Sequence, residues 1–408
     1  MINISKLWLE CIGVWVCRIL IGIAFIVSAF TKGVDPWGTI FKLEQYFAVW
    51  GLQQPRSLLL VLTIVLCLVE FLIGISIFLG IYRRGAPRVG LLVIASFLIL
   101  TGYIAIFSPV DNCGCFGDAI VLGNWATFWK NVLLTALMVI LVIFNTRVKG
   151  LIGSMIQWLV LTFSIIYILI ITITGYLIQP LVDFRPFAEG TTVFAKNDSP
   201  VRLIYEKDGT KEIFDIDALP SSSSGWKYVG REDIKAEENL LTVEDDDGED
   251  VTEEIIPDEG DVLLIVTPEI SRADISATMY LNRIAAKAQQ KDIEVAGIIG
   301  GGNTDDIEKW KDLSMASYPV YRAEDTQLKE LARGETSLVY IQNGIILQKI
   351  SISIISNGLI KKLENGDIDL LTLVGFNEAR WLKLINLSYI IVIVLLVFIS
   401  IPGKLKKS

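Results

Sequence analysis

The sequence predicts a membrane α-helical bundle of six spans with an extracytoplasmic α/β domain inserted between the fifth and the sixth span. The first observation is composition, because 52 % of the 408 residues are hydrophobic and 20 % are charged. The mean hydropathy of +0.54 is too high for a soluble protein of two or three domains. The second is an uneven charge distribution: residues 181–380 hold 39 acidic and 21 basic side chains, whereas the rest of the chain holds 6 acidic and 15 basic ones. The third is a set of six long apolar runs.

Each apolar run is long enough to cross the hydrocarbon core of a bilayer, which takes about 20 residues in a helix. The runs are approximately Leu7–Phe30, Ser57–Tyr82, Ala86–Phe107, Asn124–Phe144, Leu151–Gln179 and Leu384–Ile401. The first run has no small-residue cleavage site, so we interpret it as a retained anchor and not as a removed signal peptide.

Lysine and arginine in the short loops predict the orientation, because cytoplasmic loops carry an excess of both residues. Nine basic residues fall on one side of the membrane if the spans alternate in direction: Lys6, Arg83, Arg84, Arg88, Arg147, Lys149, Lys404, Lys406 and Lys407. The first loop on the opposite side holds Lys32, Lys42 and Arg56. We therefore expect a protein of the bacterial inner (cytoplasmic) membrane with both termini in the cytoplasm and residues 180–380 in the periplasm.

The composition also excludes several classes of function. The chain has no histidine, which removes Ser-His-Asp triads, HExxH zinc sites and histidine-ligated haem. An acidic outer domain repels phosphate backbones, so we expect no nucleic-acid partner. The expected partners are membrane lipid and other envelope membrane or periplasmic proteins, the latter through residues 181–380.

Two of the five cysteines, Cys113 and Cys115, lie in the predicted outer loop 111–118, of sequence Asp-Asn-Cys-Gly-Cys-Phe-Gly-Asp. An exposed pair in an oxidising compartment is expected to form a disulfide. A bridge from residue i to residue i+2 departs from relaxed geometry and is therefore easier to reduce. Two interpretations stay open, a redox pair and a local staple that fixes the turn. We expect no metal site, because two thiolates are half of a tetrahedral set. The cysteines inside spans one and two are interpreted as small apolar residues: Cys11, Cys17 and Cys67.

Ionisable side chains inside membrane spans are costly and are candidates for a functional role. Arg18 and Glu70 lie at similar depths in spans one and two, so we predict an Arg18–Glu70 ion pair that faces the bundle interior. The pair is either a structural clamp or part of a site for transport or catalysis. Lys130 and Asn131 lie near the outer end of span four, at the depth of the cysteine loop. Lys130 either snorkels to the interface or stabilises a thiolate. Lys32, after the first run, is a further polar candidate.

These residues carry a family resemblance. It rests on Arg18-Ile-Leu-Ile-Gly22, Phe25, Ser28, Lys32, Asp35-Pro36, Tyr46, Glu70 with Gly74, Cys113-Gly-Cys-Phe-Gly117, and Phe128 with Asn131. Over about residues 12–145 the chain resembles DoxX/MauE-like membrane proteins, which implies a four-helix membrane bundle. MauE-type members are linked to disulfide formation in a periplasmic enzyme, so the resemblance implies redox chemistry. The bundle is also similar to quinone-linked thiol oxidases. Those enzymes relay electrons between two cysteine pairs, whereas this chain has one outer pair, and the cofactor is left open with a quinone as the candidate.

The outer region is predicted to begin with an acidic, β-rich segment at residues 181–257. Within it, Val201–Glu206 and Lys211–Ile216 flank Asp208-Gly209, a dipeptide typical of hairpin turns. The acidic run Asp245–Asp250 is expected to be a solvated bend, because it lacks the ligand spacing of a calcium loop.

From about residue 258 the hydrophobic pattern changes to strand, helix, strand, helix, two strands and a helix. The predicted elements are Val262–Thr267, Ile270–Gln290, Ile293–Ile299, Asp305–Leu313, Leu338–Ile341, Ile345–Ile350 and Ile354–Glu364, with Asn343-Gly344 as a hairpin turn. Over about residues 256–368 this order resembles a thioredoxin-like domain of the membrane-tethered, TlpA-like kind, with Tyr318-Pro319-Val320 before Asp325 as in that group.

The same segment departs from the thioredoxin-like pattern at two places. Where the resemblance implies a Cys-x-x-Cys motif, the chain has Thr267-Pro-Glu-Ile-Ser-Arg272. The proline expected before the third core strand is replaced by Glu335-Thr-Ser337. We therefore expect this domain to be redox-inactive and to serve as a binding or docking module.

The chain thus divides into five predicted parts, and as a whole it resembles Bacteroidetes-type DoxX proteins. The parts are the four-helix membrane domain (1–147), the fifth transmembrane helix (148–180), the acidic β-rich segment (181–257), the thioredoxin-like domain (258–380), and the sixth transmembrane helix with its basic tail (381–408). Two functions stay open: a component of an envelope complex or thiol-redox system, and a membrane thiol/quinone oxidoreductase that uses Cys113 and Cys115. Whether the chain is an enzyme is left open. A transporter is a third option, supported only by the predicted Arg18–Glu70 pair.

Overall fold

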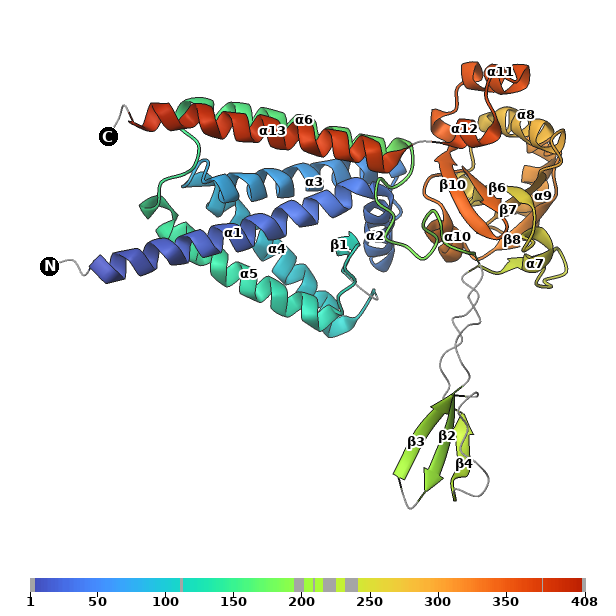
Figure 1. The fold of residues 1–408 in the computed structure, drawn as a ribbon, viewed down its shortest axis with the longest axis horizontal. Helices are drawn as coiled ribbons and strands as arrows, with labels where there is room; N and C mark the ends of the chain where they lie inside the picture. The colour runs from blue at the N-terminus through green and yellow to red at the C-terminus, as the bar shows by residue number, and fades with distance from the viewer. Residues whose placement is uncertain are drawn as a thin grey trace. The chain divides into compact units, whose positions relative to one another are not determined.

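The structure is a computed structural model that describes residues 4–110, 113–193, 202–207, 210–215, 225–231, 241–375 and 377–405 (Figure 1). The chain forms two compact units, one made of residues 1–184 and 376–408 and the other of residues 185–375. Some predicted features lie outside the described residues: Asp111 and Asn112 of the cysteine loop, the Asp208-Gly209 turn, and Lys406 and Lys407 of the tail.

The first unit is built from long apolar helices. In the described part of the chain, six helices are long and apolar enough to cross a membrane: α1 (Ile4–Val34), α3 (Arg56–Leu79), α4 (Gly85–Phe107), α5 (Asn124–Phe144), α6 (Gln157–Leu177) and α13 (Glu378–Leu405). They confirm the six predicted spans. Their outer faces carry large exposed apolar side chains such as Leu92 and Ile99, the surface expected of helices in contact with lipid. The chain is therefore a multi-span membrane protein.

Helices α1 and α3 approach each other closely because two glycines lie where they cross. A Cβ atom added to Gly74 would lie 2.8 Å from the backbone nitrogen of Ile26, and one added to Gly22 would lie 2.8 Å from Cβ of Phe78. Small residues at a membrane helix crossing let the backbones approach and pack tightly. This crossing fixes the two helices that carry the polar side chains described below.

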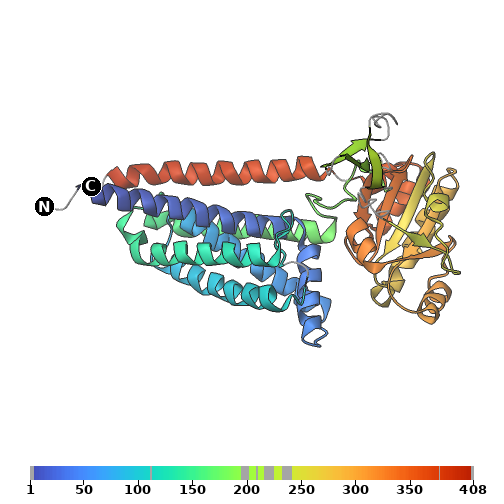
Figure 2. The same ribbon diagram turned by 90° about the horizontal axis from the view of Figure 1, so that it is seen from below.

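A short helix, α2 (Pro36–Val49), lies across one end of the bundle (Figures 1 and 2). It begins where Asp35 accepts a hydrogen bond from the backbone N–H of Gly38 at 3.1 Å, with Pro36 in the first helical turn. A capping aspartate followed by proline is a strong start for a helix. The direct turn from α1 into α2 places the α2 side chains beside the cysteine loop.

The last span, α13, packs beside α6 (Figure 1). The rings of Tyr167 and Tyr389 stack with their centroids 4.1 Å apart. The Tyr167 hydroxyl donates to Asn386 at 2.7 Å, and the hydroxyls of Ser164 and Tyr389 share a hydrogen bond of the same length. These polar contacts attach the C-terminal helix to the rest of the first unit.

The second unit contains a six-stranded sheet in the order β10-β9-β6-β7-β8-β5. The strands are β5 (Val243–Glu244), β6 (Asp261–Thr267), β7 (Glu294–Ile299), β8 (Val320–Ala323), β9 (Ser337–Gln342) and β10 (Ile345–Ser351). Strands β6, β7 and β8 are parallel, and β5, β9 and β10 each run antiparallel to their neighbours. Positive φ angles at Asn343 and Gly344 form the tight turn between β9 and β10, as that dipeptide predicts.

Helices cover both faces of this sheet. They are α7 (Thr252–Ile255), α8 (Thr278–Gln289), α9 (Thr304–Ser314), α10 (Asp325–Leu331), α11 (Asn357–Asn365) and α12 (Leu370–Val374). Side chains of α8, α11 and α12 form one buried cluster with the sheet, and those of α10 form the second. The predicted strands and helices from residue 258 are all present, but the predicted order is incomplete, because strand β8 and helix α10 lie between α9 and β9, where we expected neither.

One predicted helix begins later than expected. The sequence predicts helix from Ile270, but α8 starts at Thr278 and is preceded by two 3₁₀ turns, Ile270–Arg272 and Ile275–Ala277. The Asp274 side chain accepts a hydrogen bond from the backbone N–H of Ser276 at 2.9 Å. Such a local bond competes with the helical pattern, and it explains the delayed start.

A separate three-stranded antiparallel sheet has the order β3-β2-β4. Its strands are β2 (Arg202–Lys207), β3 (Thr210–Asp215) and β4 (Lys227–Arg231). Lys207 pairs with Thr210 across the predicted hairpin, so the pairing of these two strands is confirmed. Tyr205 lies on the central strand with the rings of Phe214 and Tyr228 5.8 Å away on either side, and this cross-strand aromatic contact favours the observed register.

The α1–α3 crossing predicts that Gly74 tolerates no side chain. In Gly74→Ala the new methyl group meets backbone, so overpacking should lower the free energy of unfolding by about 1–3 kcal/mol. Gly13→Ala is the matched control, because nothing lies within 4 Å of a Cβ at that position. Thermal unfolding in detergent measures both. Equal melting temperatures for the two variants would contradict the close crossing.

Candidate functional site

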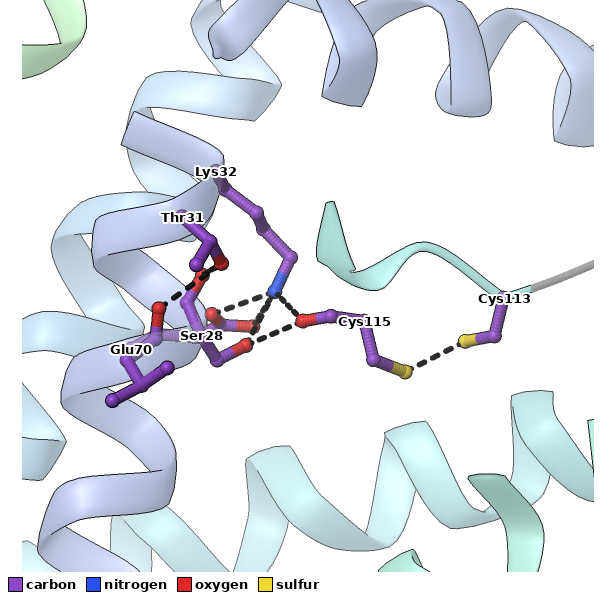
Figure 3. Close-up of polar contacts among 7 residues, drawn as sticks. Ser28, Thr31, Lys32, Glu70, Cys113 and Cys115 are labelled. Carbon is purple, nitrogen blue, oxygen red and sulfur yellow. Dashed lines mark hydrogen bonds and ion pairs between the residues drawn. The ribbon is translucent and has the colours of Figure 1, made fainter. Parts of the chain in front are cut away.

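The cysteine loop connects α4 to α5 in the first unit, and it contains the short strand β1 (Cys115–Asp118). Gly114, between the two cysteines, has φ +64°, and Gly117 has φ +57°, a backbone region that favours glycine. The Gly117 N–H donates to the Gly114 carbonyl at 3.0 Å and closes the turn. The Sγ atoms of Cys113 and Cys115 face each other 2.8 Å apart (Figure 3). The loop thus presents two neighbouring free thiols.

Both cysteines are held through their backbone carbonyls. The Cys115 carbonyl accepts from Lys32 Nζ at 2.8 Å and from Ser28 Oγ at 2.7 Å, both on α1 (Figure 3). The Cys113 carbonyl accepts from the hydroxyl of Tyr46 on α2 at 2.6 Å. Charged donors make short and strong hydrogen bonds. The loop is therefore anchored to two helices, while neither thiol is used in the anchoring.

Lys32 is itself held by an ion pair with Glu70 on α3. Lys32 Nζ lies 2.8 Å from Oε2 and 3.0 Å from Oε1 of Glu70, and it also donates to Ser28 Oγ at 2.6 Å. Lys32 is 5 % exposed and Glu70 is 1 % exposed. A buried charge is tolerated only when it is paired and hydrogen-bonded. Together, Glu70, Ser28 and Cys115 satisfy the donors of the Lys32 ammonium.

The predicted Arg18–Glu70 ion pair is wrong. Arg18 is completely buried, and it donates to Oδ1 of Asn145 at 2.5 Å and to the carbonyls of Asn145 and Val148 at 2.9 and 3.0 Å. These acceptors follow the end of α5, where carbonyls lack helical partners. The guanidinium therefore caps the C-terminal end of α5. This contact favours the structural role for Arg18 over a role in transport or catalysis.

The error has a simple physical reason. The sequence predicts that the first span ends at Phe30, which places Lys32 in a loop, but α1 continues to Val34. Lys32 thus lies inside the bundle, about 21 Å along α1 from Arg18 at 1.5 Å per residue. Glu70 pairs with the cation near the C-terminal end of α1, not with the one nearer the N-terminus.

Lys130 and Asn131 lie on α5 beside the same loop. Lys130 Nζ lies 4.2 Å from the ring centroid of Phe116, the residue after Cys115, at a distance typical of a cation–π contact. Asn131 is buried and donates from Nδ2 to Oγ1 of Thr101 on α4 at 3.2 Å. The structure thus brings together five of the predicted polar and thiol residues: Cys113, Cys115, Lys32, Glu70 and Lys130. Asn131 lies beside this group and lines the same cavity.

An apolar cavity of about 220 Å³ lies next to the thiols. Its apolar lining includes Ala24, Phe25, Leu43, Leu66, Ile94, Phe97, Leu100, Phe116 and Leu134, and its polar lining includes Ser28, Lys32, Lys42, Tyr46, Glu70, Lys130 and Asn131. Cys113 and Cys115 line it as well. Apolar walls with a few convergent polar groups are the usual character of a small-molecule site.

The surroundings make the two thiols unequal. The hydrogen bond between the two thiols, together with the nearby Lys130 and Lys32 cations, lowers the pKa of Cys115 to about 7 despite its burial. The same hydrogen bond and burial raise the pKa of Cys113. Burial, with Cys113 close by, also raises the pKa of Tyr46, which keeps its hydroxyl a donor. The thiolate is the reactive form of cysteine, and at neutral pH Cys115 is the thiol that forms it.

Sequence reasoning assigned no role to two residues that hold the loop, Ser28 and Tyr46. Both occur among the residues that carry the family resemblance. Ser28 precedes Lys32 by four residues, so the two lie on the same face of α1, and this spacing was a usable indication. The contact of Tyr46 could not be read from the sequence, because it depends on the turn from α1 into α2.

Comparison with known families supports the membrane part of this description. The family described as "Methylamine utilisation protein MauE" matches residues 11–144. The chain therefore carries a MauE-family domain. That MauE domain contains the cysteine loop, the Lys32–Glu70 pair and the cavity. A second family, described as a domain of unknown function (DUF8463), matches residues 201–238, where the three-stranded sheet lies. No curated protein and no solved structure matches the chain.

The buried ion pair predicts a specific stability pattern in the MauE domain. Lys32→Met or Glu70→Leu alone leaves one buried charge without its partner, which should cost about 3–5 kcal/mol of unfolding free energy. The double variant Lys32→Met with Glu70→Leu removes both charges and should recover most of that loss. Thermal unfolding in detergent measures the set, with Lys383→Met as a control that removes an exposed lysine of α13. A double variant as unstable as the sum of the single variants would contradict the ion pair.

Proposed function

We propose that the MauE domain carries out thiol–disulfide exchange with a client protein on the outer side of the membrane, through Cys113 and Cys115. The observation that carries this proposal is the pair of thiols 2.8 Å apart at the wall of an apolar cavity. A disulfide requires an S–S distance of about 2.05 Å, so the sulfurs have less than about 1 Å to move. A loop of three residues gains little stability from a bridge, which favours a redox role over a staple.

The exchange is balanced without any further reactant. Two thiolates of the client replace the Cys113–Cys115 bond: the client acquires a disulfide, and the two cysteines of the loop become thiols after taking up two protons. The client is oxidised by two electrons and the loop is reduced by two electrons. This is the overall chemistry of disulfide formation, in keeping with the disulfide-forming role linked to MauE-type proteins.

Return of the loop to its disulfide form needs a two-electron acceptor, and a membrane quinone is the class we propose. The apolar lining of the cavity suits a ring that arrives from lipid, and Lys130 and Asn131 are the polar side chains that would hold its carbonyl groups. When bound, such a group accepts two electrons and two protons. Lys32 and Glu70 keep the loop in contact with this cavity.

We propose that residues 258–380 form a thioredoxin-like docking domain without redox activity. The order β7-β6-β9-β10, with β6 and β7 parallel and β9 and β10 antiparallel, supports the thioredoxin-like part. All five cysteines of the chain lie before residue 116. At the place of the expected Cys-x-x-Cys motif, Glu269 forms ion pairs with Arg272 at 2.9 Å and with Lys329 at 2.8 Å. An ion-pair network therefore stands where redox thiols would be needed, in keeping with a domain without redox activity.

The same features support a second candidate function, a non-catalytic subunit of an envelope complex. The cysteine-free outer unit and the lack of a second outer cysteine pair in the sequence favour it. In that case Cys113 and Cys115 only shape the loop that α1 and α2 hold.

Thiol trapping separates the two candidates. If the loop exchanges disulfides, the one cysteine left in Cys113→Ser or Cys115→Ser can attack the disulfide of an oxidised client and displace one client thiolate, but it has no partner to break the resulting bond, so mixed disulfides with envelope proteins should accumulate in at least one of the two variants. Non-reducing electrophoresis after rapid acid quenching detects these adducts, and the Cys113→Ser/Cys115→Ser double variant should show none. Single variants without adducts, together with unchanged client thiols in the double variant, would rule out the exchange function.

The proposed orientation places both termini in the cytoplasm of an inner-membrane protein and residues 180–380 in the periplasm. The positive-inside rule supports it, because the short loops and termini assigned to the cytoplasm carry nine arginine and lysine residues, whereas the first loop on the other side carries three. The cysteine loop follows the third span and the second unit follows the fifth span, so alternating spans put both on one side.

A reporter fused near Ser221 tests this orientation. A periplasmic alkaline phosphatase fused there should be active, and one fused at the C-terminus should be inactive, since this enzyme needs disulfides that form outside the cytoplasm. The reverse pattern would overturn the orientation and, with it, the exposure of the cysteine loop to an oxidising compartment.

A further inference from the structure

We propose that Thr39 on α2 is a binding residue of the quinone site, and that its hydroxyl donates to one carbonyl oxygen of the ring while Lys130 on α5 donates to the other. This inference rests on the two-electron acceptor proposed above, and it adds the residue and the helix that hold the second end of the ring. It is carried by a buried hydroxyl that lines the cavity and that no group of the described chain pairs with.

The Thr39 side chain lines the apolar cavity beside the thiols. The residue is 7 % exposed, and among the described residues its Oγ1 atom has no hydrogen-bond partner. A hydroxyl that leaves water without gaining a hydrogen bond is costly, and buried polar groups are almost always paired. The free hydroxyl therefore marks a place where a ligand supplies the missing acceptor.

Other threonines of the bundle meet this requirement inside their own helix. Thr31 on α1 donates to the carbonyl of Val27 at 3.0 Å, and Thr101 on α4 donates to that of Phe97 at 2.7 Å. Such bonds to the carbonyl four residues earlier are common for helical threonine. Thr39 makes no such bond, so its hydroxyl stays available to the cavity.

Most other polar groups that line the cavity already have partners inside the protein. The Lys32 ammonium donates to Glu70 and to Ser28. The Tyr46 hydroxyl donates to the cysteine loop at 2.6 Å, and Asn131 uses an amide N–H on α4 at 3.2 Å. These groups hold the loop and the helices together, which leaves few of them to hold a ligand.

Lys130 is the second group with a free donor. Its ammonium lies 4.2 Å from the ring centroid of Phe116 and lines the cavity. It forms neither an ion pair nor a hydrogen bond with the residues that the structure describes. The carboxylate in the cavity lining, Glu70, is neutralised by Lys32. The ligand that fits these groups therefore offers acceptor oxygens and carries no positive charge.

A para-quinone meets these conditions, because its two carbonyl oxygens lie at opposite ends of a flat apolar ring. Thr39 and Lys130 come from different helices, which suits donors to the two ends. Apolar side chains of α1, α3 and α4 supply the walls for the ring: Phe25, Leu66 and Phe97. Apolar walls with a small number of placed polar groups are the usual way to fix the orientation of a small molecule.

Helix α2 connects this site to the cysteine loop. Thr39, Leu43 and Tyr46 are spaced four and three residues apart, so they lie on one face of the helix, and all three line the cavity. On this face, the Tyr46 hydroxyl donates to the Cys113 carbonyl at 2.6 Å. One face of α2 thus holds both the ring and the loop, which keeps the electron acceptor next to the thiols.

Binding of two quinone probes, decylubiquinone and a short-chain menaquinone, tests the assignment. The full-length protein carries Cys113→Ser/Cys115→Ser, so that the loop transfers no electrons to the probe. The rise in melting temperature with probe concentration in detergent gives the apparent Kd. Thr39→Val should weaken binding about three- to tenfold, the effect of one lost hydrogen bond, and Thr39→Ser should restore it. Lys130→Met should weaken binding at least as much, because charged donors make stronger hydrogen bonds.

Thr63→Val is the matched control. The Thr63 hydroxyl on α3 is also buried without a partner among the described residues, but Thr63 does not line the cavity. Its variant should bind both probes like the parent protein. Without added quinone, both valine variants should melt no lower than the parent, because neither hydroxyl has a bond to lose. A lower melting temperature for Thr39→Val alone would show that its hydroxyl serves the fold, and would overturn the proposal.

The outcomes separate this proposal from the function on which it rests. Equal binding by Thr39→Val and Thr63→Val would overturn the role of Thr39 and leave the acceptor site in place. Failure of both probes to bind the parent protein would overturn the quinone acceptor as well. Exchange with a client depends on neither result, because thiol trapping tests it separately.

Discussion

Lys32 and Glu70 bury opposite charges between α1 and α3, in a part of the bundle that is almost closed to solvent. Neither charge is tolerated there alone, because the cost of removing an ion from water is recovered only through its partner and its hydrogen bonds. The Lys32 ammonium also donates a hydrogen bond to the Cys115 carbonyl. The position of the cysteine loop therefore depends on an interaction inside the membrane helices and not on the loop's own short sequence.

The rest of the site follows from this constraint. Gly22 and Gly74 let α1 and α3 approach, which brings the two charges within reach. Gly114 lets the chain turn so that the thiols face each other. Tyr46 from α2 and Lys130 from α5 then approach from other sides of the loop. Side chains from four helices, α1, α2, α3 and α5, thus surround the two cysteines of the loop.

Sequence reasoning was most successful where a pattern is repeated over many residues. The six spans and the predicted strands of the second unit from residue 258 are confirmed, because long apolar runs and strand–helix alternation leave few other folds open. It failed for Arg18 and Glu70, because the apolar runs misplaced the relative depth of the two residues: Glu70 lies at the level of Lys32, about 21 Å along α1 from Arg18. The true partner, Lys32, lies in the last turn of α1, just past the end of the apolar run. Side-chain contacts such as that of Tyr46 depend on the angle between helices, which no local pattern records.

The central claim is that Cys113 and Cys115 exchange electrons as a pair, and a redox titration tests it most directly. Membranes that contain the protein are equilibrated with glutathione buffers of stepped potential, quenched, and labelled with a maleimide of high mass. We predict a single two-electron transition in which both thiols appear together, and its midpoint should shift in Lys32→Met, which loses a cation that stabilises the reduced, thiolate-bearing form. A pair that keeps one oxidation state over the whole range would contradict the account and leave the loop a structural turn.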